Sequence, residues 1–92
     1  MRAVEFSPLA RRDLMRLEVW LAPMAPAASE RAVQTLLAAA RSLAEFPERG
    51  GRIRTNLREL IVPFGSAGYI LHYDVRPTRI LIARIYHSLK DR

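Results

Sequence analysis

The spacing of the apolar residues changes once along this chain, within the segment PERGGRIRTN at residues 47–56. From residue 8 to this segment, apolar residues recur every three or four positions, which is the period of an amphipathic helix. After it, they alternate or form short continuous runs, which is typical of strands. The segment itself holds two glycines, three arginines and no apolar periodicity, so we predict a loop there. The chain therefore divides into a helical part and a sheet-forming part.

Two helices are predicted in the helical part. Ser7 and Pro8 mark the start of the first, because serine caps free amide groups and proline fits the first helical position. This helix should cover residues 8–22 and end at Pro23, since proline cannot continue a helix. The second helix should cover residues 26–46. The connection between them is short and rich in proline, which favours an antiparallel hairpin.

Four strands are predicted, at residues 2–6, 57–63, 69–75 and 79–86. The last of these is apolar at nearly every position, which suggests an inner strand covered on both faces. The element order is then β-α-α-β-β-β, within a single domain at residues 1–92. We expect an α+β fold of two layers, with the helical hairpin packed on a small antiparallel sheet.

The formal net charge is +6 and is unevenly distributed. Residues 1–46 carry six arginines against five acids, whereas residues 47–92 carry eight arginines and Lys90 against four acids. A basic half can attract nucleic acid or an acidic protein. Arginine supplies fourteen of the fifteen cations, which fits bidentate anion recognition but equally fits a GC-rich genome.

The composition also excludes several classes of protein and site. The chain has no cysteine, which excludes disulfides and thiolate chemistry. No apolar run reaches the roughly 20 residues that a membrane span needs, and the N-terminal residues lack the apolar core of a secretory signal. We therefore expect a cytoplasmic protein without a membrane partner. No cluster of His, Asp and Glu has ligand spacing, and no phosphate-binding glycine loop is present, so we expect no metal and no cofactor.

The chain has two histidines as candidates for acid–base chemistry. His72 lies in the middle of a predicted strand and is interpreted as a structural or surface residue. His87 follows Tyr86 at the end of the last strand. It is either an exposed histidine or a general acid or base for RNA cleavage, with arginines holding the phosphate. Glu48 is the one carboxylate that we nominate as its partner.

Arg84 interrupts the apolar run of the last strand, so burial would require a partner. Alternation predicts that it points away from the helices, together with Ile82 and Tyr86. Two interpretations remain open at this stage. Arg84 either forms a cross-strand ion pair with Glu59 or Asp74, or takes part in the function of the protein.

Two further features allow a structural or a functional interpretation. Trp20 lies beside the apolar stripe of the first helix, where it packs in the core or, if exposed, marks a groove for a partner. Arg49, Arg52 and Arg54 in the loop are either plain solvated charges or part of a binding surface.

Five segments together resemble the ParE branch of the RelE/ParE toxin superfamily: FSPLARRDL, PERGGR, LREL, GYILHYDV and ILIARIYHS. These are toxins of bacterial type II toxin–antitoxin modules, often labelled plasmid stabilization proteins. The resemblance covers nearly the whole chain, and the expected element order agrees with it. It implies a toxin that is neutralised by a cognate antitoxin, encoded adjacently, in a toxin–antitoxin hetero-oligomer.

The resemblance implies two possible activities. ParE-type members inhibit DNA gyrase, whereas RelE-type members cleave messenger RNA on the ribosome. Where RelE-type chains place a basic residue before the GY turn, this sequence has Pro63, Phe64 and Gly65, and it has Ile70 where they often have arginine. The tyrosine that follows the terminal histidine in some RelE-type chains is Ser88 here. These departures favour the ParE-like activity.

We therefore expect a gyrase-inhibiting toxin without catalytic residues. The residues expected to bind the target lie in the last strand and tail: Arg84, His87, Lys90 and Arg92. The residues expected to contact the antitoxin are apolar and lie on the two helices: Leu17, Trp20, Leu21, Val33 and Leu37. The alternative is a RelE-like ribosome-dependent endoribonuclease, with His87 as general acid or base and Arg84 as phosphate clamp.

Overall fold

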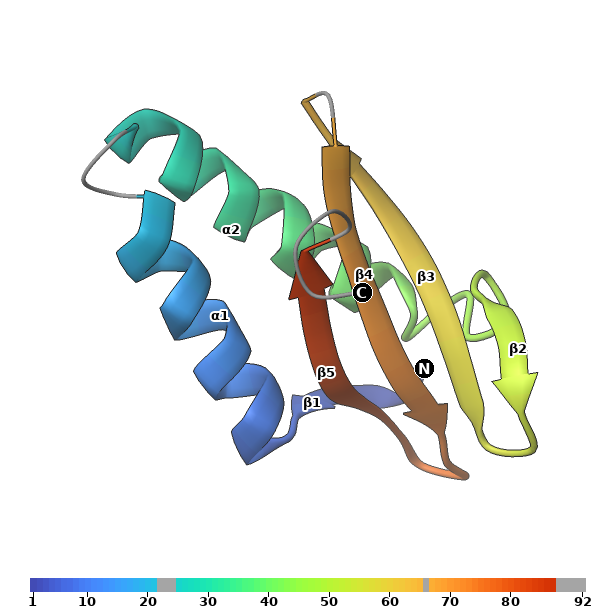
Figure 1. Cartoon of the computed structure of the whole chain (residues 1–92). Helices are drawn as coiled ribbons and strands as arrows, with labels where there is room; N and C mark the ends of the chain where they lie inside the picture. The colour runs from blue at the N-terminus through green and yellow to red at the C-terminus, as the bar shows by residue number, and fades with distance from the viewer. Residues whose placement is uncertain (22–24, 66, 88–92) are drawn as a thin grey trace.

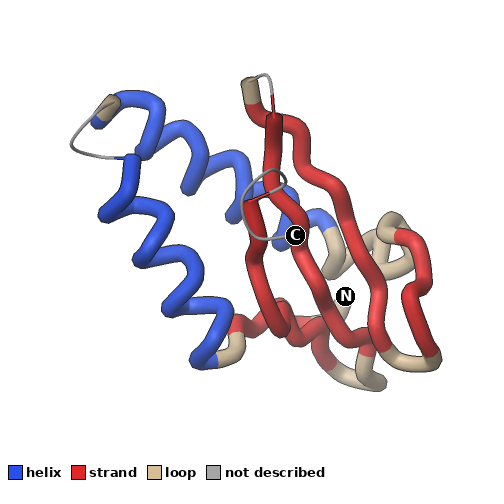
Figure 2. The backbone as a smooth tube through the Cα atoms, viewed as in Figure 1, coloured by secondary structure: helices blue, strands red, loops and turns tan. Residues whose placement is uncertain are grey.

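The computed structural model describes residues 1–21, 25–65 and 67–87 and shows two helices packed on one face of a five-stranded sheet (Figures 1 and 2). The elements in chain order are β1 (Ala3–Phe6), α1 (Pro8–Leu21), α2 (Pro26–Ser42), β2 (Gly51–Arg54), β3 (Leu57–Phe64), β4 (Ala67–Val75) and β5 (Arg79–His87). This arrangement confirms the predicted α+β fold with a helical hairpin covering a sheet. In the described part of the chain, neither helix is long and apolar enough to cross a membrane.

The sheet differs from the prediction in two respects. Its strand order is β1-β5-β4-β3-β2, and β1 pairs with β5 in parallel while the other three pairs are antiparallel. The sheet is therefore mixed, and β5 is an inner strand as predicted. In addition, β2 lies inside the segment predicted as a loop. All four of its residues are exposed, so it lacks the apolar alternation that marks a strand and forms through its pairing with β3.

The helix boundaries follow local hydrogen bonding. The Ser7 hydroxyl accepts a hydrogen bond from the Ala10 amide at 3.0 Å and donates one to the Ala83 carbonyl at 2.8 Å, so it caps α1 and joins it to β5. The helix α2 ends at Ser42, before the predicted residue 46. There the Ser42 hydroxyl donates to the Ala39 carbonyl at 2.6 Å, and the amides of Leu43, Ala44 and Glu45 bond carbonyls three residues back instead of four.

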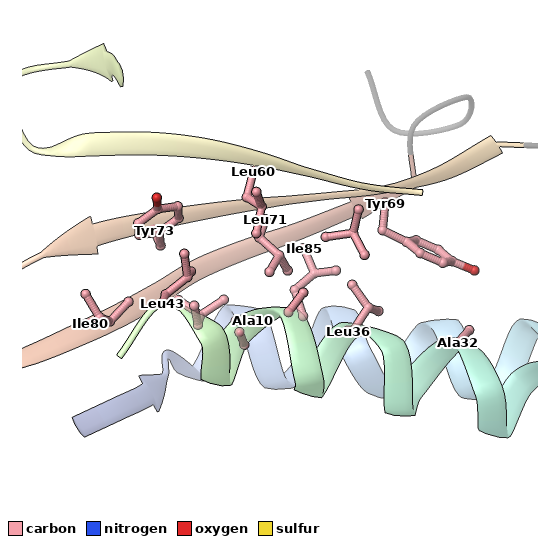
Figure 3. Packing of buried hydrophobic residues seen from close by; sticks show 14 residues of the cluster. Ala10, Ala32, Leu36, Leu43, Leu60, Tyr69, Leu71, Tyr73, Ile80 and Ile85 are labelled. Carbon is pink, nitrogen blue, oxygen red and sulfur yellow. The ribbon is translucent and has the colours of Figure 1, made fainter. Parts of the chain in front are cut away.

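The core lies between the two helices and the sheet, as Figure 3 shows. Small residues of the helices let the two layers approach closely, and larger residues of the strands fill the space between them. The fully buried members are Ala10, Ala32, Leu36, Ala40, Leu43, Leu71, Tyr73, Ile80 and Ile82. Alternate residues of β4, namely Tyr69, Leu71 and Tyr73, therefore point toward the helices.

A β-bulge interrupts the pairing of β4 with β5. His72 is paired with Arg84, but the next residue, Tyr73, is paired with Ile82, which leaves Ala83 as the extra residue. The prediction that Ile82 and Arg84 share a face is therefore wrong, because the bulge changes the alternation between them. Ile82 is in the core, and Arg84 shares the opposite face with Tyr86.

The loop between α2 and β2 is held against the sheet by Tyr73. Its hydroxyl donates to the Pro47 carbonyl and accepts from the Gly50 amide, both at 2.8 Å. Burial raises the pKa of this phenol above its ordinary value, so the hydroxyl that donates to Pro47 keeps its proton further into alkaline solution than an exposed tyrosine does. Arg58 of β3 closes the same loop by donating to the Gly50 carbonyl at 2.6 Å.

Candidate functional site

The sheet face opposite the helices carries two rows of side chains across its three central strands. Register pairs Glu59 of β3 with His72 of β4, and His72 with Arg84 of β5. Ile70 and Tyr86 are paired in the adjacent row. Because paired residues point to the same face, a carboxylate, an imidazole and a guanidinium lie in one line beside an aromatic ring.

These side chains contact one another. The His72 Nε2 atom is 2.9 Å from a Glu59 carboxylate oxygen, and the two side chains are about three-quarters buried. The ring of His72 meets the ring of Tyr86 edge to face, with centroids 5.0 Å apart. The Arg84 guanidinium carbon lies 5.0 Å from the centroid of that same tyrosine ring. Tyr86 therefore joins the His72–Glu59 pair to Arg84.

Arg84 is anchored from the helical layer by Asp13 of α1. The two carboxylate oxygens accept hydrogen bonds from Arg84 Nε at 2.9 Å and from a terminal guanidinium nitrogen at 3.1 Å. The Ile85 amide donates a third hydrogen bond to the same carboxylate at 2.8 Å. The Asp13 side chain is 8% exposed and that of Arg84 36%. The planar guanidinium is thus held in one orientation with one side toward solvent.

Sequence reasoning named Glu59 and Asp74 as ion-pair partners for Arg84 and missed Asp13. Asp74 pairs instead with Arg76 at 3.3 Å. The signal for Asp13 was its position three residues after Ala10, which places it next to the buried stripe of the first helix.

The structure separates His87 from Arg84. His87 is paired with Tyr69, a core residue, and the two rings pack edge to face with centroids 5.4 Å apart. It therefore lies on the helix side of the sheet, whereas Arg84 lies on the opposite side with His72. The two members of the alternative catalytic pair are not brought together, and Glu48 lies in the loop after α2. Lys90 and Arg92 lie outside the described residues.

The residues nominated for the antitoxin are partly buried where the structure describes them. Leu17 packs against the core, and Val33 and Leu37 are half-buried on α2. The side chains of Trp20 and Leu21 lie outside the described part. The exposed apolar side chains of α1 are instead Leu9, Met15 and Val19, with exposed fractions of 47%, 64% and 73%.

The exposed face of α1 combines apolar and basic groups. Met15 and Val19 line a shallow groove together with three arginines, Arg11, Arg12 and Arg16. An apolar row flanked by guanidinium groups suits an amphipathic partner that carries acidic side chains. Met15 and Val19 were not among the residues predicted to contact the antitoxin, because they lie off the buried apolar stripe of the helix.

The sheet face opposite the helices, called the open face below, has groups that can transfer a proton and bind an anion. A carboxylate within hydrogen-bond distance of an imidazole can orient it for acid–base chemistry. Arg84 is partly neutralised by Asp13, which weakens its attraction for a further anion. Among residues 1–21, 25–65 and 67–87, no three His, Asp or Glu side chains are grouped to hold a metal ion.

Comparison with known proteins finds a ParE family match and relatives that carry RelE names. Residues 4–92 match the family described as the ParE toxin of the type II toxin–antitoxin system parDE. Toxin RelE3 of Caulobacter vibrioides is 48% identical over 92 residues, which is 100% of both chains. Toxin RelE1 of the same organism is 39% identical over 83 residues, covering 90% of this chain and 89% of that protein.

A solved structure shares the fold at lower sequence identity. A chain of the structure titled chromosomal ParDE TA system from P. aeruginosa superposes with a TM-score of 0.77 and 19% sequence identity. The match covers 95% of this chain and 96% of that one.

Proposed function

Because this chain belongs to the ParE toxin family of type II toxin–antitoxin systems, we propose that it inhibits DNA gyrase by binding it, without breaking a bond itself. As a toxin of this type, the protein has an antitoxin as its partner. The proposed target-binding residues lie at the end of β5 and beyond it: Arg84, His87, Lys90 and Arg92. Their role would be electrostatic docking on an acidic surface of the target or its DNA.

The separation of His87 from Arg84 is the observation that carries this proposal. A nuclease acting through His87 needs an anion-binding group on the same side of the sheet, because oriented groups supply most of the rate acceleration. Here the histidine packs on Tyr69, and the arginine is anchored by Asp13 on the other face. A binding role needs charge at the surface but no such constellation.

The gyrase proposal predicts a specific loss on removal of the tail charges. The toxin, separated from its antitoxin, is expected to inhibit supercoiling by purified gyrase. The double variant Lys90→Gln/Arg92→Gln should be about tenfold or more less potent, because two cationic contacts at a docking surface are removed. The measurement is the toxin concentration that halves supercoiling.

Arg31→Gln/Arg41→Gln provides the matched control, because it removes the same charge from exposed positions on α2. Its potency should stay within about twofold of the unmodified toxin. Intact supercoiling at all concentrations of the unmodified toxin would refute the proposal. Equal losses in the two double variants would refute the assigned residues.

Ribosome-dependent cleavage of messenger RNA is the second candidate, and the His72–Glu59 pair favours it. This pair lies beside Tyr86 and Arg84 on the sheet face opposite the helices, so it places an acid–base group next to a guanidinium group. In this mechanism, His72 replaces His87 as the proton-transferring residue. Glu59→Gln and His72→Gln should then each reduce cleavage about a hundredfold, the contribution expected of general acid–base catalysis.

The RNA assay is run with ribosomes and the same toxin preparation as the supercoiling assay. Asp74→Asn is the control, since Asp74 lies on the same strand and pairs with Arg76 outside the His72–Glu59 pair. Transcripts left intact by the unmodified toxin would eliminate the second candidate. Cleavage that depends on His72, together with unaffected gyrase, would reverse the ranking.

We also propose that the antitoxin covers the helical hairpin. The contacts would come from the partly buried residues Leu17, Val33 and Leu37, from Trp20 and Leu21, and from the exposed residues Met15 and Val19. An acidic amphipathic segment fits the arginine-flanked groove on α1, because its charge and its apolar row are complementary to this surface.

Val19→Asp is expected to weaken antitoxin binding about tenfold or more, because a carboxylate replaces a contact in an apolar row. The Val19 side chain is 73% exposed, so the free toxin should keep its stability. Binding is measured by titration with the purified antitoxin that is encoded next to the toxin. Glu18→Ala, one position away in α1, is the control. Unchanged affinity in Val19→Asp would place the antitoxin elsewhere.

A further inference from the structure

A polar pocket lies at the end of the molecule where β2 and β3 meet the loop that follows α2. Its volume is about 310 Å³, and three arginines line it: Arg2, Arg52 and Arg58. Glu48 is the one carboxylate among the lining residues. The site is separate from the open-face residues, because Arg52 and Arg58 are paired in register with each other on the helix side of the sheet.

Two of the three guanidinium groups are held in place by backbone carbonyls. Arg58 donates from one terminal nitrogen to the Gly50 carbonyl at 2.6 Å, and the Gly50 loop is itself fixed by the Tyr73 hydroxyl. Arg2 donates from Nε to the Arg76 carbonyl at 2.7 Å. A guanidinium has five N–H donors, so each retains donors for a ligand. The pocket is therefore built before any ligand arrives.

The charge of the pocket is not balanced within the described part of the chain. The ion pairs found there join other residues: Glu5 with Arg79, Asp13 with Arg84, Glu59 with His72, and Asp74 with Arg76. None of the three pocket arginines is within ion-pair distance of a described carboxylate. Like charges that line one pocket repel each other, and a bound anion would relieve that repulsion.

The donor set fits a phosphate group better than a carboxylate. Thr55 and Asn56, in the turn between β2 and β3, add a hydroxyl and an amide to the three guanidinium groups. A carboxylate presents two oxygens in one plane, whereas a phosphate presents its oxygens in several directions and accepts more donors. Arginine forks match phosphate oxygens in pairs.

We propose that this arginine pocket, lined by Arg2, Arg52, Arg58, Thr55 and Asn56, binds a phosphate group of a nucleic acid or nucleotide. The site is independent of the proposed function, since it needs neither gyrase nor RNA cleavage. It gives a role to two arginines of the β2–β3 hairpin, Arg52 and Arg58.

The test is a titration of the toxin chain of residues 1–92, separated from its antitoxin and labelled with ¹⁵N, followed by NMR. The probes are inorganic phosphate, a 5′-phosphorylated oligothymidylate, the same oligothymidylate without the terminal phosphate, and polyglutamate. Saturable shifts of the Thr55 and Asn56 amides are expected with the first two probes. Binding that needs the terminal phosphate assigns the site to a phosphate monoester, and equal binding of both oligothymidylates assigns it to the backbone phosphodiester.

Arg52→Gln is the diagnostic variant, and Arg54→Gln is its matched control. Both arginines are exposed on β2, but only Arg52 lines the pocket, and both variants lose one charge. Arg52→Gln should lower the affinity for the 5′-phosphorylated oligothymidylate about tenfold or more, which is the usual effect of losing a charged hydrogen bond. It should also lower the slope of log affinity against log salt by about one. Arg54→Gln should change affinity by about twofold or less.

Three outcomes would overturn the proposal. Absence of saturable shifts at Thr55 and Asn56 with both inorganic phosphate and the 5′-phosphorylated oligothymidylate would show that the pocket is not a phosphate site. Equal losses in Arg52→Gln and Arg54→Gln would show diffuse attraction to a basic surface. Tighter binding of polyglutamate than of the phosphorylated oligothymidylate would assign the pocket to an acidic protein segment. Circular dichroism of both variants confirms that they are folded.

Discussion

Replacing Asp13 with alanine is expected to lower the free energy of unfolding by about 3 kcal/mol, because a nearly buried carboxylate with three hydrogen bonds is removed. The substitution leaves the Ile85 amide without its acceptor at the point where β5 extends past the end of β1. It also releases the Arg84 guanidinium, which is partly exposed and can be solvated, so the loss is smaller than for a fully buried ion pair. Urea unfolding of the purified toxin measures the effect.

Two companion variants separate the causes of this loss. Asp13→Asn keeps an acceptor for the Ile85 amide but lacks the charge, so its stability should lie between those of the unmodified protein and Asp13→Ala. Glu18→Ala removes an exposed carboxylate from the same helix and should change stability by about 0.5 kcal/mol or less. A stability of Asp13→Ala equal to that of Glu18→Ala would contradict the anchoring role of Asp13.

Gly50→Ala should destabilise the fold by about 2–4 kcal/mol, because there is no room for a methyl group at this position. A Cβ atom there would lie 2.7 Å from the Glu59 carbonyl oxygen and 2.7 Å from the Tyr73 hydroxyl oxygen. The first is backbone of the neighbouring strand, and the second is the group that holds the loop. The loop must shift, and the buried hydroxyl then loses its hydrogen bonds to Pro47 and Gly50.

The adjacent glycine gives a matched control for this prediction. A Cβ atom on Gly51 would have no atom within 4 Å, so Gly51→Ala should leave the unfolding free energy within about 0.5 kcal/mol of the original value. Both variants are compared by thermal and urea unfolding. Equal stability of the two alanine variants would show that the loop can shift without lowering the free energy of unfolding, and that Tyr73 does not hold it in place.

The elements with strong local signals were predictable from the sequence. The Ser7-Pro8 start of α1 is a property of two adjacent residues, and the inner position of β5 follows from its continuous apolar run. In contrast, β2 is exposed and rich in arginine, so only its hydrogen bonding to β3 makes it a strand. Its existence depends on contacts that no local pattern encodes.

The candidate site was less predictable, because it depends on pairing between distant segments. His72 was interpreted as a structural or surface residue from its place in the middle of a strand, and its contact with Glu59, 13 residues away on another strand, was not foreseen. Arg84 was expected beside Ile82 because simple alternation does not anticipate the bulge at Ala83. Asp13 is 71 residues from Arg84 in the sequence, and only the packing of α1 against β5 brings them together.

Ala83 is an extra residue in β5, so the alternation of side chains between the two faces of the sheet reverses at this point. If β5 paired with β4 without the bulge at Ala83, regular alternation from Ile82 would send the Arg84 side chain toward the apolar interior and turn Ile85 outward. The bulge therefore decides which side chains of β5 a target meets on this face, as much as the residue types do.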